Sequence, residues 1–132
     1  LTLYGTPLSG HVHRVTLLLR MLELPHDYIE AGADVRQSPE VKKLNPWGQI
    51  PVLVDGETVI ADSNAILVYL VNTYAPDTHW LPKDAVEAAL TQQWLGKAAG
   101  EIRYGVASAR LIKQFGTAED YASAIKVAGR FS

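Results

Sequence analysis

The chain has 132 residues, of which 48% are hydrophobic and 20% charged, and its formal net charge is −2. This composition excludes a disordered or fibrous chain, gives no sign of a nucleic-acid or polybasic membrane partner, and contains no apolar run of the roughly 20 residues that span a bilayer. Cysteine is absent, which excludes disulfide bonds, cysteine-based zinc sites and redox dithiols and favours a cytoplasmic protein.

A short strand and a helix are predicted at the beginning of the chain. Residues 1–4 are followed by Gly5-Thr6-Pro7, a pattern that predicts a strand rather than a signal peptide. From Gly10 to the residues before Leu24-Pro25, apolar side chains recur at the spacing of one helix face. These side chains are Val12, Val15, Leu18, Leu19 and Leu22. Residues 26–31 are predicted to form a second strand.

A short helix and a hairpin are predicted next. Ser38-Pro39-Glu40 has the composition of a helix N-terminus, and this helix is expected to end before Asn45-Pro46. Strands over 51–54 and 57–60 are expected to be joined by a turn at Asp55-Gly56. This pair accommodates the positive φ angles that a two-residue turn requires.

A further helix is predicted from Asp62-Ser63-Asn64, which completes the order β-α-β-α-β-β-α over residues 1–75. A βαβ unit followed by a hairpin and a helix forms a small mixed sheet covered by helices, because the crossover between parallel strands is right-handed. We therefore expect an α/β thioredoxin-like N-terminal domain over these residues.

The rest of the chain is predicted to be helical. Residues 76–84 contain two prolines and are expected to form a linker, and residues 85–132 are expected to form the start of an all-α C-terminal domain. One long helix is expected over about 84–115 with Gly116 as its C-cap, and Thr117-Ala118-Glu119-Asp120 resembles a capping box that begins another helix. Because the chain lacks an initial methionine and stops inside this helix, we expect a fragment with an incomplete helical domain.

Ser9 and two histidines occupy the expected N-terminus of the first helix. Free amides and the helix dipole favour an anion there, and a hydroxyl can donate a hydrogen bond to a thiolate. Taken alone, however, a serine at this position is better interpreted as an N-cap. His11 and His13 are two positions apart and do not share a helix face, so the pair is not expected to bind a metal ion.

Two further segments are candidates for ligand binding. Ile50 precedes Pro51 at the entry to a strand, where an outward-facing backbone can pair with a peptide-like ligand; the alternative is a plain strand entry. Asp62 and Ser63 lie at a helix N-terminus, where the hydroxyl and amide of Ser63 can hold a carboxylate and Asp62 can hold an ammonium group. The alternative is an N-cap, and both interpretations are compatible if Ser63 plays both parts. A γ-glutamyl group bears both charged groups, an ammonium and a carboxylate, on the same carbon atom.

Three segments together resemble the cytosolic glutathione transferase family. They are Ser9 with Arg14-Val15 (S-x-x-x-x-R-V), residues 45–53 (N-P-x-G-x-[IV]-P-x-L) and Asp62-Ser63-x-Ala65-Ile66 ([ED]-S-x-A-I). They occur in order, each at its expected strand or helix junction. The resemblance is to the serine-using type of the bacterial, phi and theta classes, and it covers the N-terminal domain and only the first helices of the C-terminal domain.

The resemblance implies roles for individual residues. Ser9 would hold the glutathione sulfur as a thiolate, with Tyr4 as the second choice. The backbone of Ile50, before a cis Pro51, would pair with the cysteinyl unit. The other implied contacts are Asp62 and Ser63 for the γ-glutamyl end and Gln37 and Gln49 for the glycyl end.

The resemblance also implies partners. Glutathione would be the co-substrate and a hydrophobic electrophile the second substrate, bound in a pocket to which His11, Tyr104 and Ser108 contribute, and no metal is expected. A homodimer is implied, with Trp47 packed either across its interface or within one subunit. The expected function is conjugation of glutathione in cytoplasmic detoxification. The alternatives are a peroxidase, isomerase or dehalogenase activity, or a non-catalytic interaction or stress protein.

Overall fold

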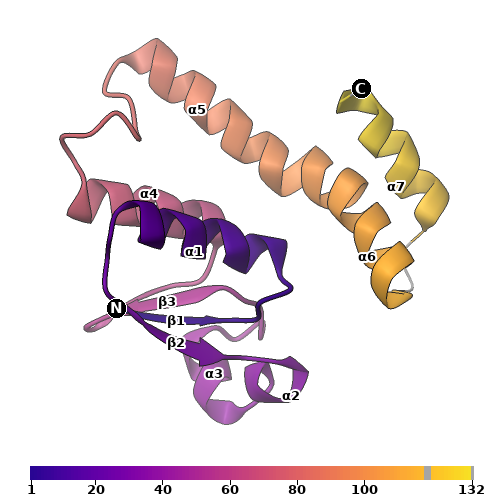
Figure 1. Cartoon of the computed structure of the whole chain (residues 1–132), viewed down its shortest axis with the longest axis horizontal. Helices are drawn as coiled ribbons and strands as arrows, with labels where there is room; N and C mark the ends of the chain where they lie inside the picture. The colour runs from indigo at the N-terminus through magenta and orange to yellow at the C-terminus, as the bar shows by residue number, and fades with distance from the viewer. Residues whose placement is uncertain (118–119, 132) are drawn as a thin grey trace. The chain divides into compact units, whose positions relative to one another are not determined.

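The computed structural model describes residues 1–117 and 120–131 and contains two compact units, Leu1–Leu81 and Pro82–Ser132. In chain order (Figure 1), the elements of the first unit are β1 (Thr2–Gly5), α1 (Gly10–Met21), β2 (Asp27–Glu30), α2 (Ala33–Arg36), α3 (Pro39–Leu44), β3 (Val52–Asp55), β4 (Thr58–Ile60) and α4 (Ser63–Tyr74). The elements of the second unit are α5 (Ala85–Lys97), η1 (Ala98–Ala107), α6 (Ser108–Phe115), α7 (Tyr121–Ala128) and η2 (Gly129–Phe131).

The first unit has a thioredoxin-like fold with a mixed four-stranded sheet in the order β2-β1-β3-β4. β1 pairs with β2 in parallel and with β3 antiparallel. β3 and β4 form the predicted hairpin, but Asp55 pairs with Thr58, so the turn is Gly56-Glu57 rather than Asp55-Gly56. Gly56 alone of these residues has a positive φ, of 57°, which explains why the turn begins at the glycine.

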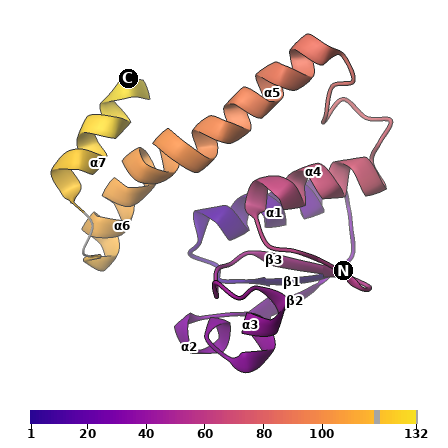
Figure 2. The ribbon, with the colours of Figure 1, turned by 180° about the vertical axis from the view of Figure 1, so that it is seen from behind.

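The core of this unit lies between the sheet and helices α1 and α4, which cover one face (Figures 1 and 2). It contains four of the five predicted apolar positions of α1, with Leu22 packed at its margin, and joins them to buried side chains of β1, β3 and α4. The buried partners are Leu3, Leu53, Ile66, Leu70 and Val71. α2 and α3 lie on the opposite face of the sheet, where Val41 is buried. Removal of this apolar surface from water holds α1 and α4 on the sheet.

The predicted order of elements in this unit is confirmed, with one helix added. α2 is a single turn between β2 and α3; none of its residues is buried, and Gly32 before it offers no side-chain cap. Four residues cannot display an apolar period of 3.6, so the pattern that predicts the other helices is absent here.

The long helix expected over residues 84–115 is continuous but not uniform. Asp84 caps its start, and Gly116 ends it with a left-handed φ of 64°, as predicted. Between α5 and α6, η1 is π-helical over ten residues. Its wider turn brings residues five apart together, so that Ser108 Oγ donates to the carbonyl oxygen of Arg103 at 3.0 Å.

α7 packs against η1 at a glycine. A Cβ on Gly105 would lie 2.7 Å from the backbone nitrogen of Ala128, so this close approach requires glycine. α7 begins after Asp120, whose Oδ1 accepts a hydrogen bond from the amide of Ala122 at 2.9 Å. The predicted capping box includes residues 118–119, which lie outside the described residues. In the described part of the chain, no helix is long and apolar enough to cross a membrane.

Candidate functional site

Ser9 lies where the chain passes from β1 into α1. A Cβ on Gly5 would lie 2.4 Å from Cγ1 of Val12, so the end of the strand can pass this helix only because it is glycine. Ser9 is the N-cap of α1, and its Oγ accepts a hydrogen bond from the amide of Val12 at 3.3 Å. This bond uses one lone pair of the hydroxyl oxygen, and the hydroxyl proton remains available for donation. The same side chain can therefore cap the helix and donate to an anion at the helix N-terminus.

Tyr4 lies in β1 and points away from this helix. Successive side chains of a strand alternate between the faces of a sheet. Leu3 belongs to the core that contains α1, and Gly5 approaches the same helix. The side chain of Tyr4 is therefore directed to the opposite face. Of the two expected sulfur donors, only Ser9 lies at the N-terminus of α1.

Asn45 organises the loop between α3 and β3. Its side chain is buried; Nδ2 donates to the carbonyl oxygen of Gln49 at 2.9 Å, and Oδ1 accepts from the amide of Trp47 at 3.3 Å. The peptide bond between Ile50 and Pro51 at the end of this loop is cis. The sequence motif contains Asn45, but its pattern alone does not reveal that this side chain holds the loop.

Gln37 reaches the same loop from the end of α2. A Cβ on Gly48 would lie 2.9 Å from Nε2 of Gln37, and the φ of Gly48 is 61°. The positive φ favours glycine at this position, whereas the Gln37 amide is the end of a flexible side chain and can move aside. The structure thus places Gln37 beside the segment that contains Gln49 and the cis peptide bond before Pro51.

The N-terminus of α4 forms the second part of the site. Asp62 is its N-cap, with Oδ1 accepting from the amide of Ala65 at 2.8 Å. Ser63 is buried in the first turn, and its Oγ lies 3.4 Å from Nδ1 of His11. The expectation that Ser63 caps α4 is wrong, because the residue with the extended backbone of an N-cap is Asp62. Its expected role as a ligand contact stays a prediction.

The two histidines of α1 have different surroundings. His11 is expected in a second-substrate pocket, and the structure places it against Ser63, at the beginning of α4. His13 is exposed and lines a separate cavity. Among residues 1–117 and 120–131, no three histidine, aspartate or glutamate side chains come together as a metal site.

Arg14 joins α1 to α4. Its Nη1 donates to Oδ1 of Asn64 at 2.6 Å. Burial lowers the pKa of the Arg14 guanidinium, and the nearby Asp62 carboxylate opposes this change; arginine remains charged at neutral pH in either case. The contact holds the N-termini of α1 and α4 side by side, so that the amide dipoles of both helices act on one region. Sequence spacing cannot reveal a partner 50 residues away.

Tyr104 and Ser108 lie in the helical unit. Ser108 is buried, and its Oγ accepts from Nη1 of Arg103 at 2.8 Å while it donates to the Arg103 carbonyl. Tyr104 is exposed, with the Arg103 guanidinium 5.3 Å from its ring centroid. Both residues line a cavity of about 350 Å³, which has η1 and α6 on one side and α7 on the other. Ser108 is buried and its hydroxyl proton is used within the helix, so Tyr104 is the more accessible of the two.

Known proteins similar to the chain have one family in common. The chain matches the family described as "Glutathione S-transferase, N-terminal domain" over residues 3–78. It is 40% identical over 98 residues to glutathione S-transferase 3 of Zea mays, a match that covers 72% of the chain and 44% of that protein. It is also 40% identical over 96 residues to glutathione S-transferase Z1 of Arabidopsis thaliana, with 70% and 42% covered.

Solved structures support the same relationship. A glutathione transferase homologue from Drosophila mojavensis with bound glutathione is 34% identical, with a TM-score of 0.86 over 98% of the chain and 61% of that structure. An epsilon-class glutathione S-transferase from the housefly, Musca domestica, is 30% identical, with a TM-score of 0.85 over 98% and 62%. The chain thus spans less than half the length of these curated relatives and about three fifths of the solved ones.

Proposed function

The chain belongs to the glutathione S-transferase family, and from this premise we propose that it binds glutathione at the N-termini of α1 and α4 and activates the thiol for attack on an electrophile. The main support is that two helix N-termini meet through the Arg14–Asn64 and His11–Ser63 contacts. Helix N-termini favour anions. Glutathione has a carboxylate at its γ-glutamyl end and, once activated, a thiolate in its centre.

Ser9 is the proposed donor to the sulfur. The glutathione thiol loses its proton to water, the sulfur forms a bond to an electrophilic carbon, and the leaving group departs with its electron pair. A decrease of about two units in the thiol pKa corresponds to roughly 2.7 kcal/mol. The Ser9 hydroxyl, the dipole of α1 and nearby amides together are sufficient for such a shift. Ser9 forms no covalent bond in this mechanism.

The ends of glutathione are assigned to different elements. The carboxylate of Asp62 pairs with the γ-glutamyl ammonium group, and the amide and hydroxyl of Ser63 hold the γ-glutamyl carboxylate. The backbone of Ile50 pairs with the cysteinyl unit, and Gln37 with Gln49 binds the glycyl end. The proximity of Gln37 to Gly48 supports the last assignment.

A hydrophobic electrophile is the proposed second substrate, with Tyr104 as a contact. The proposal includes a homodimer, and it is supported by Trp47, which is 80% exposed and so is not packed among the described residues of the chain. A large aromatic side chain on the surface is typical of an interface. Cytoplasmic location and a role in detoxification are part of the same proposal and rest on family membership.

Calorimetric titration of the chain with glutathione tests the proposal. We expect glutathione to bind and cysteinylglycine, which lacks the γ-glutamyl end, to bind much more weakly. Turnover of a chloronitrobenzene with glutathione would support conjugation, whereas turnover of an organic hydroperoxide alone would indicate a peroxidase. The absence of glutathione binding would overturn the proposal.

A further inference from the structure

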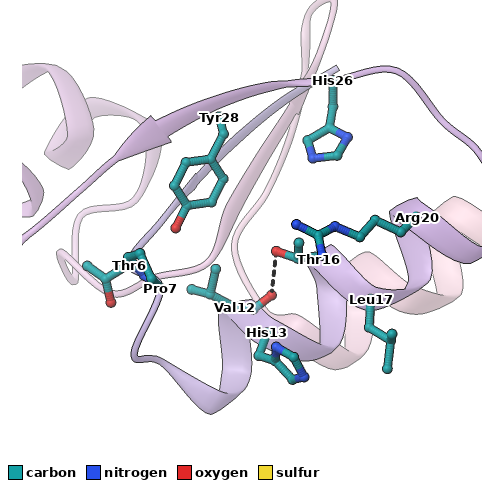
Figure 3. A pocket seen from close by; sticks show the side chains of 9 residues that line it. All are labelled: Thr6, Pro7, Val12, His13, Thr16, Leu17, Arg20, His26 and Tyr28. Atoms are coloured by element: carbon teal, nitrogen blue, oxygen red, sulfur yellow. Dashed lines mark hydrogen bonds between the residues drawn. The ribbon is translucent and has the colours of Figure 1, made fainter.

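A cavity of the N-terminal unit lies at the edge of the sheet, between α1 and β2 (Figure 3). Its volume is about 340 Å³, which is in the range of small-molecule sites. One wall is formed by Thr16, Leu17 and Arg20 of α1, and the wall opposite by His26 and Tyr28. All residues that line it belong to the unit Leu1–Leu81.

This cavity is separate from the proposed glutathione site. At 3.6 residues per turn, Thr16, Leu17 and Arg20 occupy a different side of α1 from His11 and Arg14, which face α4. None of the residues proposed to bind glutathione lines the cavity. The two sites are therefore on opposite flanks of one helix.

One part of the cavity is lined by groups that suit an anion. The Arg20 guanidinium extends into it from α1, and the Tyr28 hydroxyl points inwards from β2 (Figure 3). Nδ1 of His26 lies 2.9 Å from the carbonyl oxygen of Leu24 and must donate to it, so Nε2 of the neutral ring is an acceptor, and Arg20 and Tyr28 are the groups that suit an anion. Burial and the charge of Glu30 raise the pKa of Tyr28, which keeps its hydroxyl protonated. No aspartate or glutamate is among the lining residues.

The other part of the cavity is apolar. Pro7, Val12 and Leu17 line it, and Leu17 is an exposed hydrophobic residue of α1. Thr16 adds little polarity, because its hydroxyl donates to the carbonyl oxygen of Val12 at 3.2 Å. A ligand that satisfies both parts has one compact negative charge and a small apolar body.

We propose that this cavity is a second ligand site that binds a small aromatic carboxylate. The carboxylate pairs with the planar guanidinium of Arg20, which matches its two oxygens, and accepts a further hydrogen bond from Tyr28. The ring lies against Leu17 and Pro7. A single guanidinium beside an apolar wall suits one negative charge on an aromatic ring better than the multiple charges of phosphate.

Calorimetric titration of the whole chain with benzoate tests this site. We expect benzoate to bind and benzamide, its neutral isostere, to bind at least about tenfold more weakly, because a charged hydrogen-bond pair is lost. Arg20→Gln should weaken benzoate binding by about tenfold as well. Arg110→Gln, at an exposed arginine of the helical unit, is the matched control and should leave it unchanged.

Several results would overturn the proposal. These are equal affinity for benzoate and benzamide, unchanged benzoate binding in a folded Arg20→Gln variant, tighter binding of inorganic phosphate than of benzoate, and displacement of benzoate by glutathione. The benzamide and phosphate titrations need no variant, so they decide the matter even if Arg20→Gln does not fold. Benzoate binding in a chain that fails to bind glutathione would support this site while overturning the proposed function.

Discussion

The two units of the chain hold their helices in different ways. In the N-terminal unit, α1 and α4 bury a continuous apolar cluster against the sheet. In the helical unit, α5 has no buried residue and leaves Val86, Leu90 and Trp94 exposed. α7 meets η1 at Gly105 and buries only Ala124.

This difference shows that apolar residues at helical spacing form a core only where a facing surface exists. The N-terminal unit contains that surface, its own sheet, and the proposed glutathione site lies entirely within this unit. We therefore expect substitutions in the two units to differ in their effects on stability and on glutathione binding.

Removal of an apolar side chain should produce the largest difference in stability between the two units. Leu19 is 0% exposed and Leu90 is 53% exposed. Leu19→Ala should lower the free energy of unfolding by about 2–5 kcal/mol, because it leaves a cavity between α1 and the sheet. Leu90→Ala should change it by at most about 0.5 kcal/mol. Urea unfolding followed by circular dichroism compares them, and equal losses would contradict the distinction between the units.

Ser9→Ala should reduce conjugation strongly while glutathione binding persists. Ser9 supplies only one part of the thiolate stabilisation, and a hydrogen bond to a charged group contributes about 1.5–3 kcal/mol, so the reaction should slow by roughly 10- to 100-fold at neutral pH. The pKa of the bound thiol, followed by thiolate absorbance, measures the cause directly. Ser38→Ala is the matched control, because Ser38 caps α3 in the same way and is not at the site. Unchanged activity in Ser9→Ala would assign the sulfur contact to another donor.

Asp62→Asn should weaken glutathione binding by about tenfold or more, because the ammonium group loses its charged partner. Asparagine is as good an N-cap as aspartate, so α4 should remain intact. Asp84→Asn makes the same change at the cap of α5 in the helical unit and should leave affinity unchanged. Calorimetry measures both variants. Equal affinities in the two would remove Asp62 from the site.

Two glycines of the helical unit should respond to alanine with opposite signs. Gly105→Ala places a Cβ 2.7 Å from the backbone of Ala128 and should destabilise the packing of α7 by about 1–3 kcal/mol. A Cβ on Gly100 would meet nothing within 4 Å, so Gly100→Ala should stabilise the helix by about 0.4–1 kcal/mol. Thermal unfolding by circular dichroism reports both, and shifts of the same sign would be inconsistent with this packing.

The smallest effect should come from Asp55, which ties the hairpin to α4 by accepting from the hydroxyls of Tyr74 at 2.5 Å and Tyr69 at 2.7 Å. These two hydrogen bonds lower the pKa of Asp55. The stability that they give the folded chain is therefore complete above the ordinary carboxyl pKa and is lost as the pH falls through the lowered pKa of Asp55.

The bond to Asp55 also raises the pKa of Tyr74 to about 12. The stability from the protonated Tyr74 hydroxyl is therefore complete below the ordinary phenol pKa and is lost as the pH rises through about 12.

Tyr74→Phe should therefore lower the Tm slightly at pH 7 and lose this effect in acid. Water screens the contact, so the change should be no more than about 1 kcal/mol. Tyr121→Phe, at an exposed tyrosine of the helical unit, is the control and should show no such pH dependence. A Tm difference for Tyr74→Phe that persists at pH 2 would contradict the role of the Asp55 carboxylate.

The elements of the N-terminal unit could largely be predicted because their signals are local. The apolar period of α1, the N-cap of α3 at Ser38 and the positive φ at Gly56 all depend on residues close in sequence. α2 could not be predicted, because one exposed turn has no such period. The π-helical form of η1 also escaped prediction, since apolar spacing does not distinguish it from an α-helix.

The sequence by itself determined the order of the strands and of every helix of the N-terminal unit except α2, the family, and the short segments from which a glutathione site can be built. Only the tertiary structure decided that His11 faces Ser63, that Arg14 holds Asn64 and that Tyr4 points away from α1. The physical reason is that a local pattern specifies which face of each element is apolar. The packing of those faces then decides which polar side chains, far apart in the chain, come within hydrogen-bond distance.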